Sequence, residues 1–220
     1  MPTGVALRDP REQLFEAAER VLLRDGPHAL TSRAVTTEAG CAKGVLHRHF
    51  TDFDAFLAEL VRDRVGRVRA QADTLLAAAG SGTVIGNLTG VLTELFGSVA
   101  GAIVGLLIFR DDLRARLRET TPVGIPILSE AAAMLTAYLA RERELGRLDA
   151  AADVDVLAPT LIGSAHLIHA DRTGAPPEAA AVRKAVTAIV GGVVRETGVV
   201  RETGVVRETG VVRETEGEAG

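Results

Sequence analysis

The chain has 220 residues, of which 47% are hydrophobic and 25% charged, and its formal net charge is -4. This length suits one domain of ordinary size or a small domain joined to a larger one, and the composition excludes a disordered chain, a collagen-like fibre and a disulfide scaffold. The single cysteine, Cys41, excludes an internal disulfide. Because the whole chain is acidic, binding to a nucleic acid would need a local basic patch.

The N-terminus has no basic segment followed by an apolar run, so we expect no signal peptide and a cytoplasmic location. The longest uncharged apolar stretch, residues 95–109, would span only about 22 Å as a helix, against about 30 Å of hydrocarbon. Gly97, Gly101 and Gly105 recur every four residues and would leave one bare helical face, that is, a face without side chains. We interpret the stretch as a buried helix that lets another helix approach closely.

Apolar spacing and capping residues predict helices throughout the N-terminal half. In chain order, these helices run from Pro10 to Gly26, from Thr31 to Gly40, from 42 to 49, and from 51 to about 78. The same signals predict helices in the second half, and no alternating strand pattern competes before Gly191. They comprise more than one helix over 83–109, a helix opened by Pro122 and Pro126 that ends near Gly146, a helix capped by Asp153 or Asp155, and a last helix carrying Val182 to Val193.

The predicted fold class is therefore all-α, with a charged, exposed piece over 111–119 and a turn over 174–177. We divide the chain into a helix-turn-helix domain at 8–55, a helical regulatory and dimerisation domain at 56–195, and a tail at 196–220. The tail continues a Gly-Val-Val-Arg-Glu-Thr repeat, whose four copies start at 192, 198, 204 and 210. A six-residue period builds no fixed apolar face on a helix or a strand, so the prediction is a disordered tail; the alternatives are an extended last helix or an interaction tail.

The most informative segment is 31–50, where two short helices surround a tight turn at Gly40. Val35, Ala39 and Leu46 would hold the two helices together in a helix-turn-helix. The second of them displays Lys43, His47, Arg48 and His49, and the segment carries three basic residues against one acidic residue. A DNA major groove about 12 Å wide admits one such helix. DNA binding is thus indicated, although the same shape also occurs in proteins that do not bind DNA.

The sequence gives little evidence for a catalytic or metal site. Cys41 stands where a small apolar residue is expected, so we interpret it as core filler and not as a nucleophile. His166 and His169 lie near Asp171 on a predicted helix, but two histidines without a third partner favour an ordinary helix face over a metal site. No nucleophile, base and acid stand at a recognisable spacing. We expect no enzyme, no cofactor and no metal.

Residues 11–60 resemble the N-terminal DNA-binding domain of the TetR family of bacterial transcriptional regulators. The segments that carry the resemblance are Leu14 to Leu22, Gly26, Leu30-Thr31, Glu38-Ala39-Gly40, Lys43-Gly44-Val45-Leu46, His49-Phe50, Asp54-Ala55-Phe56 and Leu60. They cover about a quarter of the chain and are fairly specific; the remainder resembles the family only in its helical pattern.

This resemblance implies which residues contact DNA. The residues expected at the DNA backbone or in the groove are Thr31, Arg33, Lys43, Gly44, Val45, His47, Arg48 and His49. Two departures matter: His47 stands where the family usually has Tyr or Phe, and Phe53-Asp54 stand where a Lys-Glu pair is common. The first weakens the claim for that phosphate contact, and the second removes one backbone contact.

The resemblance also implies a homodimer on a near-palindromic double-stranded DNA operator, regulated by a small molecule. The helices around 155–170 and 178–194 would pair between protomers, and an effector in the C-terminal domain would bias the long helix 51–78. Candidate lining residues are Phe96, Leu106, Phe109, Leu128, Met134, Leu135, Tyr138 and His166, each of which is alternatively core. The expected function is a transcriptional regulator, and a repressor in preference to an activator. The alternative is a helical small-molecule-binding protein with a degenerate helix-turn-helix.

Overall fold

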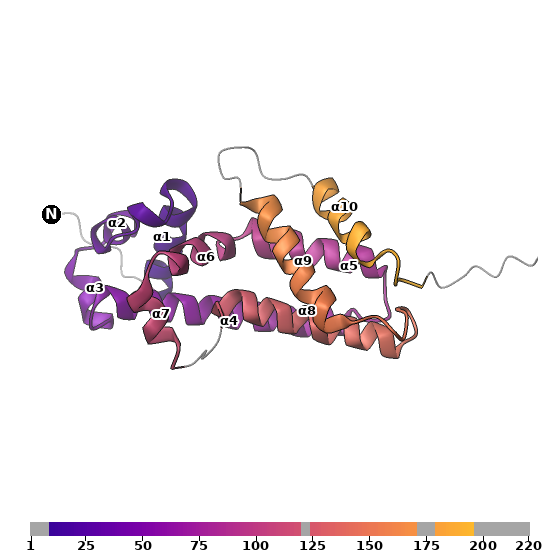
Figure 1. Cartoon of the computed structure of the whole chain (residues 1–220). Helices are drawn as coiled ribbons and strands as arrows, with labels where there is room; N and C mark the ends of the chain where they lie inside the picture. The colour runs from indigo at the N-terminus through magenta and orange to yellow at the C-terminus, as the bar shows by residue number, and fades with distance from the viewer. Residues whose placement is uncertain (1–8, 120–123, 171–178, 196–220) are drawn as a thin grey trace, which may run out of the picture.

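The computed structural model in Figure 1 is an elongated stack of helices and describes residues 9–119, 124–170 and 179–195. Within these ranges every regular element is helical, so the predicted all-α class is confirmed; one isolated antiparallel bridge joins Leu148 to Val194. The elements are α1 (Pro10–Asp25), η1 (Pro27–Ala29), α2 (Ser32–Glu38), α3 (Gly44–His49), α4 (Phe53–Ala77), α5 (Val84–Gly97), α6 (Ala100–Ile108), α7 (Asp111–Leu117), α8 (Pro126–Glu144), α9 (Val154–His169) and α10 (Ala179–Val190).

The first helix begins and ends where its local sequence signals place it. The Asp9 side chain caps α1 by accepting hydrogen bonds from the backbone amides of Arg11 and Glu12, at 3.0 and 3.2 Å. Pro10, which has no amide hydrogen to satisfy, occupies the first helical position. Gly26 ends the helix with a φ of 81°, in the left-handed region that glycine adopts at little cost.

The long helix α4 connects the two ends of the molecule (Figure 1). Asp52 caps it, since its carboxylate accepts a hydrogen bond of 2.6 Å from the Ala55 amide. Its 25 residues span roughly 37 Å. Phe56, Leu57 and Leu60 near its start are fully buried, and it packs extensively along α8. A displacement of α4 at one end is therefore carried directly to the other.

The C-terminal region is a helical bundle in which α5 packs against α9 and α10, and α8 packs against α4 and α9. Leu92 of α5, Leu135 of α8, Leu161 of α9 and Val186 of α10 contribute fully or almost fully buried side chains. Apolar burial of this kind is the main favourable contribution to the stability of such a bundle.

Residues 84–108 form two helices, as predicted, and α5 and α6 are bent by 56° relative to each other. The break separates Gly97 from Gly101 and Gly105, so the prediction that these three glycines share one bare helical face is wrong. Gly105 instead faces η1, where a Cβ atom would lie 3.5 Å from the Pro27 side chain. Among the described residues no single helix is long and apolar enough to cross a membrane; only α5 and α6 together reach that length and composition, as a bent pair.

Residues 111–117 correct a second prediction, because they are not simply an exposed charged piece. They form α7, whose Leu113 and Leu117 are buried. Their four-residue spacing places both on one face, a signal that the surrounding charges obscured. Three other predictions lie outside the described residues: the contribution of Pro122 to a helix start, the turn at 174–177 and the tail at 196–220.

Candidate nucleic-acid interface

The helix-turn-helix has the geometry that its sequence predicts. Gly40 adopts a φ of 65° between α2 and α3, a conformation that favours glycine. The amide of Cys41 closes the turn by donating to the Thr36 carbonyl at 3.0 Å. Thr31 caps α2, since its hydroxyl oxygen accepts a hydrogen bond of 3.1 Å from the Ala34 amide. These local signals fix the angle at which α3 leaves α2.

Helix α3 is anchored to the rest of the domain by two apolar side chains. Leu46 is fully buried, and Phe50, which directly follows α3, is 3% exposed. The Phe50 ring lies 5.9 Å from that of Phe15 in α1 and 5.1 Å from that of Phe56 in α4. The Arg11 guanidinium covers the same ring at 4.7 Å from its centroid. This contact fixes α3 between α1 and α4, a role that the His49-Phe50 motif does not reveal in the sequence.

Helix α2 is held to α1 by a carboxylate that sequence reasoning did not assign. Glu38 accepts hydrogen bonds from Arg20 Nε and Arg24 Nη1, each at 2.8 Å. These two guanidiniums hold the pKa of Glu38 below its ordinary value. The separations of 18 and 14 residues offer no helical periodicity, so the pairs could not be read from the sequence.

The predicted DNA-contacting residues lie on an exposed surface of α2 and α3, at one end of the molecule (Figure 1). The exposed members are Thr31, Arg33, Lys43, Gly44, His47, Arg48 and His49, whereas Val45 is half-buried. Among the described residues, Arg33, Lys43 and Arg48 form no ion pair, whereas Arg20 and Arg24 of α1 both pair with Glu38. We call the three the free cations; they give this surface the local positive charge that the chain as a whole lacks.

Cys41 packs half-buried against the hydrophobic core next to the turn. Burial raises the pKa of its thiol, because the thiolate loses solvation in an apolar site. The thiol therefore stays protonated near neutral pH. This placement agrees with the interpretation of Cys41 as core filler.

The predicted ligand-lining residues fall into two groups. Five of them are buried in the C-terminal core, namely Phe96, Leu106, Met134, Leu135 and Tyr138; Leu128 and His166 are half-buried. Phe109 is not brought together with the others. Its side chain is 69% exposed, and its ring lies 5.5 Å from that of His28 in η1.

Tyr138 is held in a polar network rather than turned toward an open cavity. Its hydroxyl accepts a hydrogen bond of 3.0 Å from Asn87 Nδ2. Burial, followed by a hydrogen bond to the Glu142 carboxylate, raises the tyrosine pKa. Glu142 is itself fully buried and accepts from the Gly80 amide at 3.3 Å, with Arg147 at 3.4 Å. This network joins α8 to the loop between α4 and α5.

The two histidines of α9 contact an aromatic ring. The rings of His166 and His169 each lie 5.8 Å from that of Phe96, and His169 Nδ1 lies 2.8 Å from the Ala165 carbonyl oxygen. Within the described ranges, which exclude Asp171, no group of three His, Cys, Asp or Glu side chains is placed to hold a metal.

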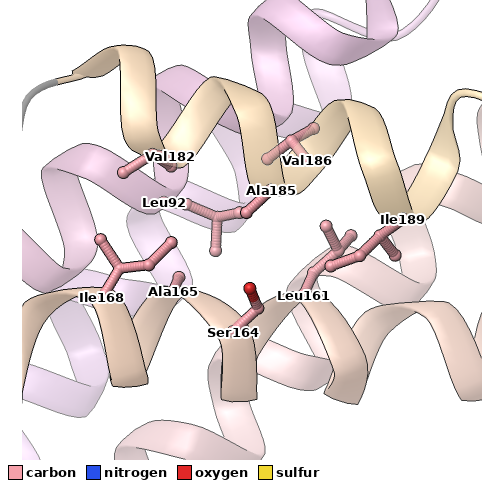
Figure 2. Close-up of a pocket in the computed structure, with 9 residues that line it drawn as sticks. All are labelled: Leu92, Leu161, Ser164, Ala165, Ile168, Val182, Ala185, Val186 and Ile189. Atoms are coloured by element: carbon pink, nitrogen blue, oxygen red, sulfur yellow. The ribbon is translucent and has the colours of Figure 1, made fainter.

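Figure 2 shows the apolar junction of α5, α9 and α10. Its lining side chains are Leu92, Leu161, Ser164, Ala165, Ile168, Val182, Ala185, Val186 and Ile189. The space between them does not admit a water molecule. This junction is therefore packed core, and it positions α9 and α10 as one layer.

Comparisons with known proteins agree with this architecture. Residues 14–60 match the family described as bacterial regulatory proteins, tetR family, whereas no curated protein matches the chain. The transcriptional regulator FadR from Bacillus subtilis, solved in complex with stearoyl-CoA, superposes with a TM-score of 0.62 at 18% identity, covering 83% of this chain and 98% of that chain. FadR from Bacillus halodurans superposes with a TM-score of 0.64 at 18% identity, covering 86% of this chain and 98% of that chain.

A TetR transcription regulator from Haloarcula marismortui gives a TM-score of 0.63 at 15% identity, covering 86% of this chain and all of that chain. At these identities the shared property is the fold, whereas the match over residues 14–60 concerns the DNA-binding domain. The N-terminal domain thus belongs to the TetR family of bacterial regulatory proteins, and the chain as a whole has the fold of solved TetR-family transcription regulators.

Proposed function

We propose that the protein is a dimeric transcriptional repressor whose α2–α3 surface binds operator DNA and whose C-terminal domain binds a small-molecule effector. The observation that carries the proposal is the set of free cations, Arg33, Lys43 and Arg48, on an exposed helix-turn-helix of an otherwise acidic chain. Cations without carboxylate partners are available to phosphates and guanine edges. Thr31, Gly44, Val45, His47 and His49 complete the proposed DNA-contacting set.

In this proposal the DNA-binding domain comprises residues 8–55 and the regulatory domain begins at residue 56. Besides the continuity of α4, two of the ion pairs that join them involve α7. Arg110 and Arg116, at either end of α7, pair with Asp54 and Asp52 at the start of α4, at 3.2 and 3.1 Å. A regulatory domain that moves α7 would therefore move the helix that carries the DNA-binding unit.

Dimerisation through α9 and α10 is supported by an exposed stripe on α9. Val156 is 58% exposed and Leu167 is 76% exposed, with exposed Thr160 and Gly163 between them at helical spacing. Large apolar side chains at this exposure favour burial against a partner. We expect Leu167→Glu to convert the dimer to a monomer in sedimentation velocity, with unchanged helicity. A dimer that persists in this variant would contradict the α9 interface.

The effector would relieve repression by binding more tightly to the arrangement that does not fit DNA. Solved proteins of this fold include one with stearoyl-CoA, and the multidrug binding protein EbrR complexed with imidazole. These ligands differ widely in size and charge, so the effector of this chain has to be inferred from its own side chains.

The test is fluorescence anisotropy of the full chain on DNA from upstream of its own gene, beside a scrambled duplex of equal composition. We expect selective binding, two chains per duplex, and an affinity that falls steeply with salt as counterions are released. His47 and the Phe53-Asp54 pair, which depart from the usual DNA-contacting residues, favour one alternative: a small-molecule-binding protein that no longer reads DNA. Weak, equal binding to both duplexes, with no bound genomic fragment enriched, would support that alternative and reject the repressor.

A further inference from the structure

The first copy of the Gly-Val-Val-Arg-Glu-Thr repeat is bound to the loop between α8 and α9. The Asp149 amide donates a hydrogen bond of 2.8 Å to the Val193 carbonyl. In the opposite direction, the Arg195 amide donates a hydrogen bond of 2.9 Å to the Arg147 carbonyl. This is the pattern of a short antiparallel pair of extended segments. We call residues 147–149 the docking edge, because they hold the last residues that the structure describes.

Side chains of the repeat add selectivity to these backbone bonds, which many sequences can make. Val194 lies directly opposite Leu148, which is 1% exposed, so the two side chains lie on the same face. Val193 and Val194 are both half-buried against the hydrophobic core. The Arg195 guanidinium pairs with the Asp149 carboxylate at 3.2 Å. The docking edge is therefore complementary to the sequence Val-Val-Arg.

The docking edge is held in place by contacts with the bundle. Arg147 Nη2 donates to the Gly82 carbonyl at 2.7 Å, and its Nη1 lies 3.4 Å from the carboxylate of the fully buried Glu142. The Arg147 amide donates to the Glu142 carbonyl at 2.9 Å. Leu148 belongs to the hydrophobic core. These contacts come from α8 and from the loop between α4 and α5, so the edge is positioned independently of the segment that pairs with it.

Three further copies of the same sequence follow in the chain. The Val-Val-Arg of 193–195 recurs at 199–201, 205–207 and 211–213. A shift of the chain by six residues therefore presents the docking edge with the same side chains, on the same faces of an extended segment. Any smaller shift places Gly, Glu or Thr at one or more of the three positions. The repeat thus defines a few equivalent registers, six residues apart.

The glycine before the first copy is a requirement of α10 and not of the docking edge. A Cβ atom at Gly191 would lie 2.5 Å from the Thr187 carbonyl oxygen, at the end of α10. The later copies follow Thr197, Thr203 and Thr209, but none of them directly follows α10. Threonine at that position therefore does not prevent a later copy from pairing with the edge.

We propose that the docking edge binds any copy of the repeat, and that the second copy, residues 198–203, occupies it when the first copy leaves. Six additional residues of linker keep the second copy at a local concentration on the order of millimolar. The first copy is preferred, because the amides of Val193 and Val194 also donate hydrogen bonds of 3.0 Å to the Val190 carbonyl.

An exchange of copies changes the length of chain that tethers α10. With the first copy docked, only Gly191 and Gly192 separate Val190, the last residue of α10, from the docked residues. With the second copy docked, residues 191–198 separate them. Helix α10 packs on α5 and α9, and the longer tether leaves it held by that apolar packing alone. The repeat therefore sets how tightly the last helix of the bundle is fastened.

The experiment is hydrogen exchange, measured by NMR at the Asp149 amide in four full-length chains. This amide bonds to the docked copy, so its protection reports the occupancy of the docking edge. Aspartate at the second valine of a copy sets a carboxylate opposite Leu148 and near Asp149, which disables that copy. The chains are the parent, Val194→Asp, the later-copy variant with Val200→Asp, Val206→Asp and Val212→Asp, and the variant with all four changes.

The four chains give distinct results if the copies exchange. The later-copy variant keeps the protection of the parent, because its first copy is intact. Val194→Asp lowers protection roughly tenfold, since the second copy closes a longer loop. The variant with all four changes loses a further several-fold. Equal protection in Val194→Asp and in the variant with all four changes would overturn the proposal.

A charge reversal identifies the copy that is bound. Asp149→Arg repels the arginine of every copy, and Arg201→Asp added to it restores the ion pair for the second copy alone. We expect protection of the amide of residue 149 to rise roughly threefold over Asp149→Arg. Adding Arg195→Asp is the positive control, and Arg118→Asp, an exposed reversal at the end of α7, should restore nothing. Recovery with Arg195→Asp but not with Arg201→Asp would restrict the edge to the first copy.

Dilution distinguishes a copy of the same chain from a copy of a second chain. Protection in Val194→Asp that does not change on dilution supports exchange within one chain. Protection that is lost on dilution would assign the bound copy to a second chain and overturn exchange within one chain. These measurements use the protein without DNA, so a failure of the proposed repressor function would not affect them.

Discussion

Two regions of the molecule use arginine in opposite ways. Where α4 packs on α1, Arg64 is 4% exposed and is surrounded by carboxylates from both helices. On the α2–α3 surface, the free cations Arg33, Lys43 and Arg48 are exposed and form no ion pair among the described residues. The same charge stabilises a helix contact in one region and remains available for a ligand in the other.

The difference follows from solvation. A buried guanidinium loses its water and must recover that free energy from partners inside the protein, so Arg64 is viable only with its carboxylates. An exposed cation keeps its water until a phosphate displaces it, so its lack of a partner costs little. Lack of a partner, together with a place on the α2–α3 surface, therefore distinguishes candidate contacts for DNA from structural cations, and three predictions test the distinction.

The largest expected effect is on stability at the α1–α4 contact. Arg64→Ala leaves Glu19 without its cation and Asp63 with Arg67 alone, and we expect a loss of about 3 kcal/mol, because these carboxylates can partly regain water. Urea unfolding followed by circular dichroism measures it. Arg62→Ala, an exposed neighbour on the same helix, should change stability little; equal effects in the two variants would show that burial does not govern the role of Arg64.

The second effect is on DNA affinity without loss of stability. Lys43→Ala and Arg48→Ala should each weaken operator binding roughly tenfold, and each lost phosphate contact should lower the salt slope by about one. The dimer and the unfolding curve should stay as in the parent protein. Arg62→Ala is again the matched control, since it removes one positive charge away from α2 and α3. Unchanged affinity for operator DNA in both variants would disprove the assignment of α3 to the DNA major groove.

The smallest effect is a change in acid sensitivity at Glu38. Because Arg20 and Arg24 lower its pKa in the folded protein, its contribution to stability is complete above the ordinary value of 4.5 and is lost as pH falls through the lower, folded value. Glu38→Gln should therefore flatten the dependence of the unfolding temperature on pH below about 5. Glu16→Gln, an exposed change on α1, should leave that dependence intact. Coincident curves for Glu38→Gln and the parent would refute the coupling.

The local sequence was sufficient for most of the secondary structure. Pro10, Thr31 and Asp52 begin helices, and Gly26 and Gly40 end or turn them, because capping and left-handed backbone depend on a few adjacent residues. Contacts between elements were not predictable in this way. The buried face of α7 and the exposure of Phe109 depend on which helix lies opposite, and spacing along the chain does not specify that.

The sequence by itself determined an all-α chain with a helix-turn-helix and a basic display on α3, because periodicity, caps and local charge are properties of neighbouring residues. Only the tertiary structure decided which cations are free, since pairs such as Arg24 with Glu38, or Arg64 with Glu19, join residues 14 and 45 positions apart. It also decided that α5, α9 and α10 meet in one packed apolar junction, because spacing along the chain does not specify which helix lies opposite another.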